Sequence, residues 1–370
     1  MRSMRPQAVT ALAAVGLLAL AGCSGTSSTT SASTTSATTP ATGSASSSAS
    51  PAGTAVVQPL VVYSAQGYDT AVTKAFTDAT GIPVQLVDDS TGPLLTKIAA
   101  ERNNPQWDVL WVDGDTAFAA LDKQGQLASY APAVDFTAAA KQLIPANHTF
   151  TPTGTTVMAA LIYNAARSST VPTSYQDLLG SAYTGKIGMN DPSQSGPTYP
   201  FVAGLMNQLG GQSQGQDYLS KLKANGLKVF NTNGDTLHAL ETGQIDYGLI
   251  QSSAAIGETI KVKASAQFDP KVVYVPKSTL LPGVVGIDKN VSQAKQDEAK
   301  KFVDFVLSAK GQQAMQAADP TGDSLYWPPV NGVPTAPGLP AFPTDYQRID
   351  PYFWGPLESQ INTWFDANIK

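Results

Sequence analysis

Three short stretches of small hydroxyl residues have the composition of anion-binding turns. They are Ser90, Thr91 and Gly92; Ser195, Gly196, Pro197 and Thr198; and Ser252 and Ser253. Each stands at the start of an expected helix, where free backbone N–H groups and the positive end of the helix dipole attract negative charge. Each alone is also explained by a plain helix cap. Together, if the fold turns them toward one cleft, they predict a site for a small anionic or zwitterionic ligand.

Further side chains extend this candidate site. Ser64 and Gln66 are additional donors, and Asp113 is suited to pair with a ligand amine, although it equally fits a helix N-cap. Three aromatic residues are candidate cleft walls, a role that competes with ordinary core packing: Tyr199, Tyr247 and Trp327.

Two motifs of enzymes occur without the context that their chemistry needs. Gly211–Gly215 matches G-x-S-x-G, but it follows an expected helix and a glycine pair instead of a strand. The only histidines, His148 and His238, have no setting typical of a catalytic triad. Gly180–Lys186 approaches the P-loop spacing, yet Ile187 replaces the required Ser or Thr and a strand follows instead of a helix. We therefore expect no catalysis, no cofactor and no metal.

Alternating strands and helices must position the candidate site. The first block contains expected strands at 60–63, 84–87 and 108–112, each followed by a helix, at 68–80, at 94–99 and from 116 onward. The second block repeats this order, with expected strands at 157–163, 187–189 and 247–250 and helices at 175–179, 198–209, 236–240 and from 251 onward. Such alternation predicts an α/β fold of mostly parallel sheets with helices on both faces. Ligands of these sheets bind outside the carboxyl ends of the strands, where Ser64, Ser90 and Asp113 are expected to lie.

The pattern predicts two lobes. Residues 57–150 form the first part of lobe 1, residues 151–270 form lobe 2, and residues 271–370 return to lobe 1 and end in a helical tail. Lys271–Pro276 is the expected return crossing, and 296–307 is an amphipathic helix. The aromatic tail at 346–365 is expected to pack along the outside.

The first residues have the features of an export signal. Arg2 and Arg5 precede an apolar run, Ala8–Ala21, that is short for a membrane span, so residues 1–22 are expected to be a cleaved signal peptide. The run ends in Leu20-Ala21-Gly22-Cys23, which resembles the bacterial lipobox, and Cys23 is the only cysteine, which leaves no disulfide framework. An ordinary secretory signal with a chance cysteine is the alternative. Residues 23–56 are nearly all Ser, Thr, Ala, Gly and Pro, a composition that predicts a disordered tether.

The charge of the chain excludes some partners. The net charge is -5 and only 14% of residues are charged, without a basic stripe, so we expect no nucleic-acid binding.

Several segments together resemble the type II periplasmic binding proteins, in the branch of ferric-ion, thiamine and 2-aminoethylphosphonate receptors. The segments are Val62–Ala65, Ala79–Val84, Lys97–Val109, Tyr163–Ala165, Asp191–Gly196 and Ala309–Gln313. The resemblance implies two α/β lobes joined by crossing strands, a cleft that closes around a small solute by a hinge, and delivery to an ABC importer permease.

Iron is the less favoured ligand within this branch. The ferric receptors that the chain resembles typically have neighbouring tyrosines after the strand that corresponds to 247–250, but Gln251–Ala255 stands there. Ala65–Gly67 likewise stands where a His or Glu is often found after the first strand. Fe(III) prefers phenolate and carboxylate oxygens, for which serine hydroxyls are poor substitutes.

The sequence thus predicts a monomeric solute-binding lipoprotein, anchored through Cys23 to the outer face of the cell membrane. Its best expected ligand is a phosphonate such as 2-aminoethylphosphonate, delivered to an ABC permease. The alternatives are a ferric receptor of the same family and a sensor or adhesin domain that kept the fold.

Overall fold

The computed structural model describes residues 58–157 and 160–370. The expected signal peptide (1–22), Cys23 and the tether (23–56) lie outside the described residues. The described residues all belong to one compact unit. No helix in its described portion has the length and apolar character needed to cross a membrane.

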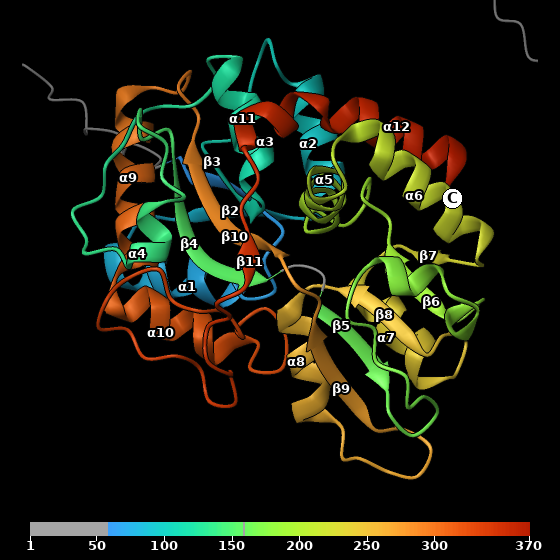
Figure 1. Cartoon of the computed structure of the whole chain (residues 1–370). Helices are drawn as coiled ribbons and strands as arrows, with labels where there is room; N and C mark the ends of the chain where they lie inside the picture. The colour runs from blue at the N-terminus through green and yellow to red at the C-terminus, as the bar shows by residue number, and fades with distance from the viewer. Residues whose placement is uncertain (1–57, 158–159) are drawn as a thin grey trace, which may run out of the picture. The chain divides into compact units, whose positions relative to one another are not determined.

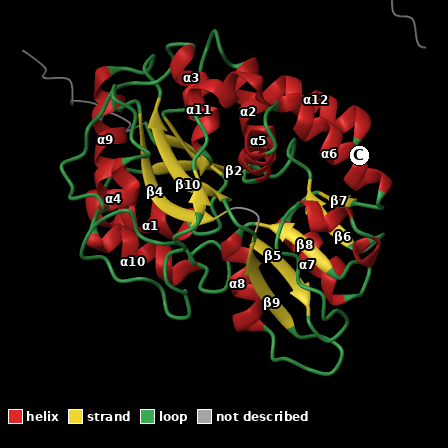
Figure 2. Ribbon diagram, in the orientation of Figure 1, coloured by secondary structure: helices red, strands yellow, loops and turns green. Residues whose placement is uncertain are grey.

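Within the described residues, the strands form two sheets (Figures 1 and 2). The six-stranded first sheet has the order β11-β10-β3-β1-β2, with β4 also beside β10. Its strands β1, β2 and β3 are parallel, and β10 runs antiparallel to both β3 and β4. Its members are β1 (Leu60–Ser64), β2 (Val84–Asp88), β3 (Val109–Asp113), β4 (Phe150–Val157), β10 (Ser278–Ile287) and β11 (Tyr346–Gln347).

The five-stranded second sheet has the order β7-β6-β8-β5-β9. Strands β7, β6 and β8 are parallel, while β5 runs antiparallel to β8 and β9. Its members are β5 (Ala160–Asn164), β6 (Ile187–Asn190), β7 (Lys228–Phe230), β8 (Tyr247–Ile250) and β9 (Pro270–Tyr274). Both sheets are therefore mixed, and each contains three parallel strands.

Helices cover both faces of the first sheet because its neighbouring residues point to opposite sides. On one face Val62 and Trp111 pack with Phe76 and Phe302, and on the other face Tyr63 packs among residues of α2 and α3. The helices are α1 (Asp69–Thr80), α2 (Thr91–Ala100), α3 (Asp115–Lys123), α4 (Ala138–Lys141), α9 (Gln293–Leu307) and α10 (Ala309–Ala318).

The second sheet is covered in the same way. Leu161 packs with α5, α6 and α12, whereas its neighbour Ile162 faces α7 and α8. The helices are η1 (Gln176–Leu179), η2 (Ser181–Tyr183), α5 (Thr198–Gln208), α6 (Gln212–Ala224), α7 (Asn233–Glu241), α8 (Ser252–Lys261) and α12 (Glu358–Asn368). The short helices α11 (Pro351–Trp354) and η3 (Gly355–Leu357) contact α3 of the first sheet.

Both crossings between the sheets differ from the prediction. The expected strand at 157–163 is divided, because Val157 ends β4 in the first sheet and Ala160 begins β5 in the second. The expected return at Lys271–Pro276 is instead the edge strand β9, which pairs with β5. The return is made by β10, after a turn in which Lys277 has a positive φ of 60°. An apolar β-rich run has the same pattern in either sheet, so the sequence alone did not assign these strands.

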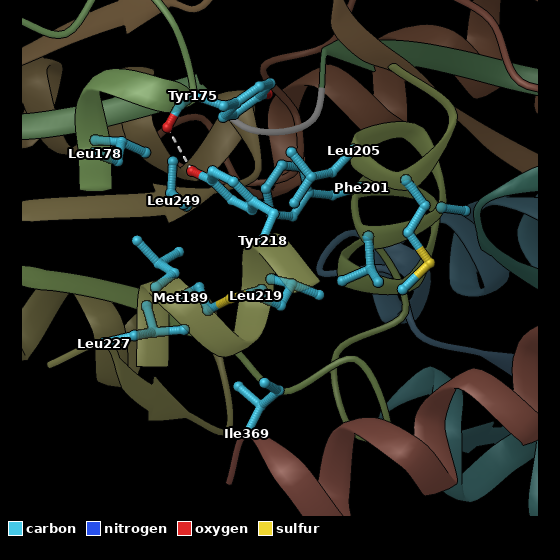
Figure 3. Close-up of a cluster of buried hydrophobic side chains, with 14 of the residues drawn as sticks. Tyr175, Leu178, Met189, Phe201, Leu205, Tyr218, Leu219, Leu227, Leu249 and Ile369 are labelled. Atoms are coloured by element: carbon cyan, nitrogen blue, oxygen red, sulfur yellow. Dashed lines mark hydrogen bonds between the residues drawn. The ribbon is translucent and has the colours of Figure 1, made fainter. Parts of the chain in front are cut away.

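The C-terminal helix α12 packs with one face against the helices of the second sheet, while its other face is exposed. Trp354, Ile361 and Phe365 are buried, and they belong to the same core cluster as Phe201 and Leu219 of the second sheet's helices. Figure 3 shows part of this cluster, including Ile369 and the hydrogen bond from the Tyr218 hydroxyl to the Tyr175 carbonyl oxygen at 2.6 Å. The spacing of 361, 365 and 369 places these apolar side chains on one face of α12.

Candidate functional site

A small crevice lies where the carboxyl ends of the parallel strands of the two sheets meet. Its volume is about 120 Å³. The first sheet and its connections supply Ala65, Ser90, Thr91, Asp113 and Asp323, and the second sheet supplies Gln194, Ser195, Gly196, Pro197, Asn231, Thr232, Asn233 and Gln251. Apart from Asp323, each follows or ends a parallel strand, the position at which α/β sheets bind ligands.

The carboxylate of Asp113 joins the two sides of the crevice. Gln66 donates from Nε2 to one carboxylate oxygen at 3.0 Å, and Gln251 donates from Nε2 to the other at 3.1 Å. Gln66 follows β1 of the first sheet, whereas Gln251 follows β8 of the second. Asp113 is therefore held by one amide from each sheet.

Two carboxyl groups give the first-sheet side an acidic character. Burial, and then the charge of Asp323, raise the pKa of Asp113 to about 7, against the lowering effect of the two glutamine amides. Burial also raises the pKa of Asp323 to about 6, although its carboxylate accepts a hydrogen bond from the Gly67 backbone N–H at 2.8 Å. A cationic group in the crevice would stabilise both carboxylates in their charged form.

A network of side-chain amides orders the second-sheet side. Asn190, fully buried at the end of β6, donates from Nδ2 to Ser195 Oγ at 3.3 Å and to Asn233 Oδ1 at 2.7 Å. Its own Oδ1 accepts from the Thr236 hydroxyl at 2.7 Å. Asn233 in turn donates to Gln251 Oε1 at 3.5 Å. Hydrogen bonds thus connect Ser195, through Asn190 and Asn233, to Gln251, whose side-chain amide donates to Asp113.

Hydroxyl groups lie at the starts of α5 and α8. Thr198 and Ser253 are fully buried, and neither hydroxyl oxygen has a hydrogen-bond partner among the residues that the structure describes. Ser252 differs, since its Oγ accepts the Val157 backbone N–H at 3.0 Å. None of these three residues lines the crevice. The second-sheet lining itself offers the hydroxyls of Ser195 and Thr232, side-chain amides and the starts of α5 and α7. These groups can bind an anionic group although they carry no full positive charge.

Two glycines allow the turns of the two sheets to touch. A Cβ on Gly196 would lie 2.2 Å from Thr91 Oγ1, and a Cβ on Gly92 would lie 2.0 Å from the Ser193 carbonyl oxygen. Both distances are far below van der Waals contact. Glycine is thus required at both positions for this arrangement.

The predicted site residues divide into three groups. Those that line the crevice are Ser90, Thr91, Asp113, Ser195 and Gly196. Those that are buried directly behind it or at the helix starts are Ser64, Gln66, Thr198, Ser252 and Ser253. Those that lie outside the crevice lining are the aromatic residues Tyr199, Tyr247 and Trp327.

The aromatic residues are core residues, which corrects the expectation of cleft walls. The Tyr199 hydroxyl donates to the Trp354 carbonyl oxygen at 2.5 Å. Tyr247 begins β8, at the end of the strand opposite to the crevice, and donates to the Thr170 carbonyl oxygen at 2.7 Å. Trp327 pairs with Thr155 as an isolated bridge. The residue type alone does not show whether an aromatic side chain lines a cleft or packs in the core.

Sequence reasoning missed several crevice residues. Asn231 and Gln251 line the crevice directly after β7 and β8, and Asn190, which ends β6, lies behind it and contacts Ser195, so a polar residue at a strand's carboxyl end was the available signal. Asp323 comes from the loop after α10, far along the chain, and no local pattern indicates it.

The structure gives no context for the two enzyme motifs. Ser213 lies in the first turn of α6, which follows α5 after a short connection, and Lys186 leads directly into β6. Among the described residues, no group of three or more His, Cys, Asp or Glu is placed to hold a metal ion.

Comparisons with known proteins agree on one family. Residues 71–345 match the profile described as bacterial extracellular solute-binding protein. A periplasmic protein of Salmonella paratyphi A that carries 2-aminoethylphosphonate binding in its name is 28% identical over 246 residues, which cover 64% of this chain and 68% of that protein. A Sinorhizobium fredii protein, named as an ABC transporter periplasmic-binding protein, is 28% identical over 69% of this chain and 71% of its own length.

A solved structure has the same fold. Iron-bound HitA from Pseudomonas aeruginosa superposes with a TM-score of 0.71, at 24% identity, over 84% of this chain and 98% of its own. The two mixed sheets flanked by helices are thus those of the two-lobed type II periplasmic binding proteins.

Proposed function

This chain belongs to the bacterial extracellular solute-binding proteins, and we propose that its solute is a small zwitterionic aminoalkylphosphonate, with 2-aminoethylphosphonate as the best candidate. The family binds a small solute for an ABC transporter and performs no chemistry on it. The proposal therefore concerns the identity of the solute and the residues that hold it.

The polarity of the crevice carries the proposal. Asp113 and Asp323 come from the first sheet and its connections, whereas Ser195 and Gly196 come from the second sheet, and Thr91 of the first sheet touches Gly196. An ammonium group suits the carboxylates, and a phosphonate suits the hydroxyls and helix N-termini. A zwitterion satisfies both sides at once.

A simple anion suits this crevice less well. Neither lysine nor arginine is among its lining residues, and two carboxyl groups would repel inorganic phosphate or sulfate. The volume of about 120 Å³ is also below the roughly 300–1,000 Å³ of sites for drug-sized ligands, which favours a short ligand. The name of the Salmonella relative supports the same solute class.

We propose that lobe 1 (57–150 and 271–370) and lobe 2 (151–270) close on the solute. Within these limits, β4 belongs to the first sheet, β9 belongs to the second sheet, and α12 packs on the helices of the second sheet. Asp113 and Gln251 come from different sheets and already contact each other. Exclusion of water by closure strengthens each hydrogen bond to the solute.

The anchoring of the protein is a separate proposal. Cys23 and the Ser/Thr-rich residues after it support a lipid anchor and tether on the outer face of the membrane, with the receptor acting as a monomer. Replacing Cys23 by Ser should release the protein into the medium in the native host. Retention of that variant in the membrane fraction would contradict lipidation at this residue.

Thermal unfolding of the purified protein tests the solute. The panel contains 2-aminoethylphosphonate, ethylphosphonate, inorganic phosphate, thiamine and ferric citrate. A ligand at 100 times its Kd adds about 2.7 kcal/mol to stability, which shifts the unfolding midpoint visibly. We expect the first compound to produce the largest shift and the double variant Thr91→Ala, Ser195→Ala to abolish it.

The matched control is Ser220→Ala, at an exposed position of α6. A shift with ferric citrate alone would contradict the proposal and favour an iron receptor. No shift with any compound would also contradict it, and a receptor or sensor of another solute would then be the better description.

A further inference from the structure

One face of α12 contacts the turn that precedes α5. Asn362, Asp366 and Lys370 are spaced by four residues, so they share a side of the helix and of its C-terminal end. Each contacts a different residue of the turn Asp191–Ser193. None of the three lines the solute crevice.

The contacts are polar and follow the helix turn by turn. Asn362 Nδ2 donates to the Pro192 carbonyl oxygen at 3.4 Å. The Ser193 hydroxyl, whose hydrogen bond to Asp191 is the shorter one, also lies 3.4 Å from Asp366 Oδ1. The ammonium group of Lys370 forms an ion pair with Asp191, whose side chain is fully buried.

Asp191 orders the whole turn from its first position. Its Oδ1 accepts the Ser193 backbone N–H at 2.9 Å and the Ser193 hydroxyl at 2.7 Å. Its carbonyl oxygen accepts the Ser195 N–H at 2.9 Å and the Gln194 N–H at 3.2 Å. The direction of the Asp191 backbone and side chain therefore fixes the place of Ser195 and Gly196 in the crevice.

The helix that makes these contacts is itself firmly held. Ile361, Phe365 and Ile369 are fully buried on its other side, in the core cluster of the second sheet (Figure 3). A rigid helix can hold a turn in place only if the contacts between them are specific. The Lys370–Asp191 pair is such a contact, because a buried carboxylate without its cation is strongly unfavourable.

We infer that Lys370 is a positioning residue, which with Asn362 and Asp366 pre-organises the 191–196 turn for the anionic group of the solute. The role in affinity rests on the proposed function, whereas the ordering of the turn does not. Pre-organisation raises affinity because less conformational entropy is lost on binding.

Hydrogen exchange in the protein without ligand tests the ordering. In Lys370→Met, which keeps an apolar stem but no charge, the amides of Ser193, Gln194 and Ser195 should exchange about 10-fold faster, as expected for the loss of one charge-assisted hydrogen bond. Lys370→Arg should restore protection to within about 3-fold, since it keeps the charge. The control is Lys221→Met, which removes a lysine from an exposed ion pair with Asp217.

Affinity gives the second readout. The Kd of 2-aminoethylphosphonate should rise about 10-fold in Lys370→Met and stay unchanged in Lys221→Met. If the wild-type protein does not bind this probe but the turn amides still respond, the proposed function fails and the positioning role stands.

Two results would overturn the inference. One is unchanged exchange of the turn amides in folded Lys370→Met. The other is faster exchange spread evenly over β6, β8 and α5, which would indicate a general loss of stability. Should Lys370→Met not fold, Asn362→Ala provides the same test through the weaker contact to Pro192, and unchanged exchange there would count against the inference.

Discussion

Replacing Asp113 by Asn should weaken the binding of an aminophosphonate and leave the binding of an amine-free phosphonate nearly unchanged. The exchange keeps the shape of the side chain, removes its charge and replaces one acceptor oxygen by an amide donor. Asp113 is 9% exposed and is held by Gln66 and Gln251, and an amide oxygen can still accept one of their hydrogen bonds. The fold should therefore tolerate the variant.

The magnitude follows from the lost charge-assisted hydrogen bond to the ligand ammonium. Such a bond contributes about 1.5–3 kcal/mol, which corresponds to an affinity loss of roughly 10- to 150-fold for 2-aminoethylphosphonate. Ethylphosphonate has no ammonium group, so the variant removes only a like-charge repulsion and its Kd should stay equal or fall.

Isothermal titration calorimetry at pH 8 measures both ligands against both proteins. At this pH the Asp113 carboxylate, with a pKa of about 7, is mostly ionised in the wild-type protein. The ratio of the two Kd values cancels any general effect of the substitution on the crevice. An equal loss of affinity for both ligands, or no loss for either, would refute the placement of the amine at Asp113.

Three further predictions concern pH, packing and the aromatic residues. Burial raises the pKa of Asp113 from 3.8 to about 7. Between about pH 4 and pH 7 the folded protein therefore keeps a proton that the unfolded chain releases, so the contribution of Asp113 to the free energy of unfolding falls as the pH rises through this range. The ammonium ligand needs the ionised form, so the affinity for 2-aminoethylphosphonate relative to ethylphosphonate should rise from pH 6 to 8, and a flat calorimetric ratio would count against it. Gly196→Ala should weaken binding by roughly 5- to 150-fold, since its Cβ would overlap Thr91 and overpacking costs about 1–3 kcal/mol. Gly234→Ala, whose Cβ would make an ordinary contact at 3.6 Å, should bind normally in the same titration. Tyr199→Phe and Tyr247→Phe should each lose about 1 kcal/mol of unfolding free energy in urea, because each loses the hydrogen bond of its hydroxyl group. The Kd of 2-aminoethylphosphonate should stay within about 2-fold of wild type, and a large change in Kd would show that these residues belong to the binding site.

The local order of the fold could be predicted because each strand and helix has its own pattern. The predicted bounds of strand β1 and helix α1 lie within one or two residues of the observed ones. Asp113 was predicted as a site residue because it stands at the carboxyl end of the strand β3. The placement of the turns at one edge followed from the geometry of parallel strands. These inferences need only neighbouring residues.

The features that were missed depend on contacts between distant segments. Strand β9 carries the same apolar pattern whether it pairs with β5 or with β10, and only the pairing decides its sheet. Asp323 reaches the crevice from a loop after α10. The packing of one face of α12 depends on the core of the second sheet, which its own sequence does not specify.

A crystal structure of the complex with 2-aminoethylphosphonate would show whether the amine and the phosphonate bind where we propose. We expect one molecule in the crevice, with its nitrogen within hydrogen-bond distance of the Asp113 carboxylate and its phosphonate oxygens at Thr91, Ser195 and Gly196. A molecule bound in the reverse orientation, or elsewhere on the protein, would contradict the proposal.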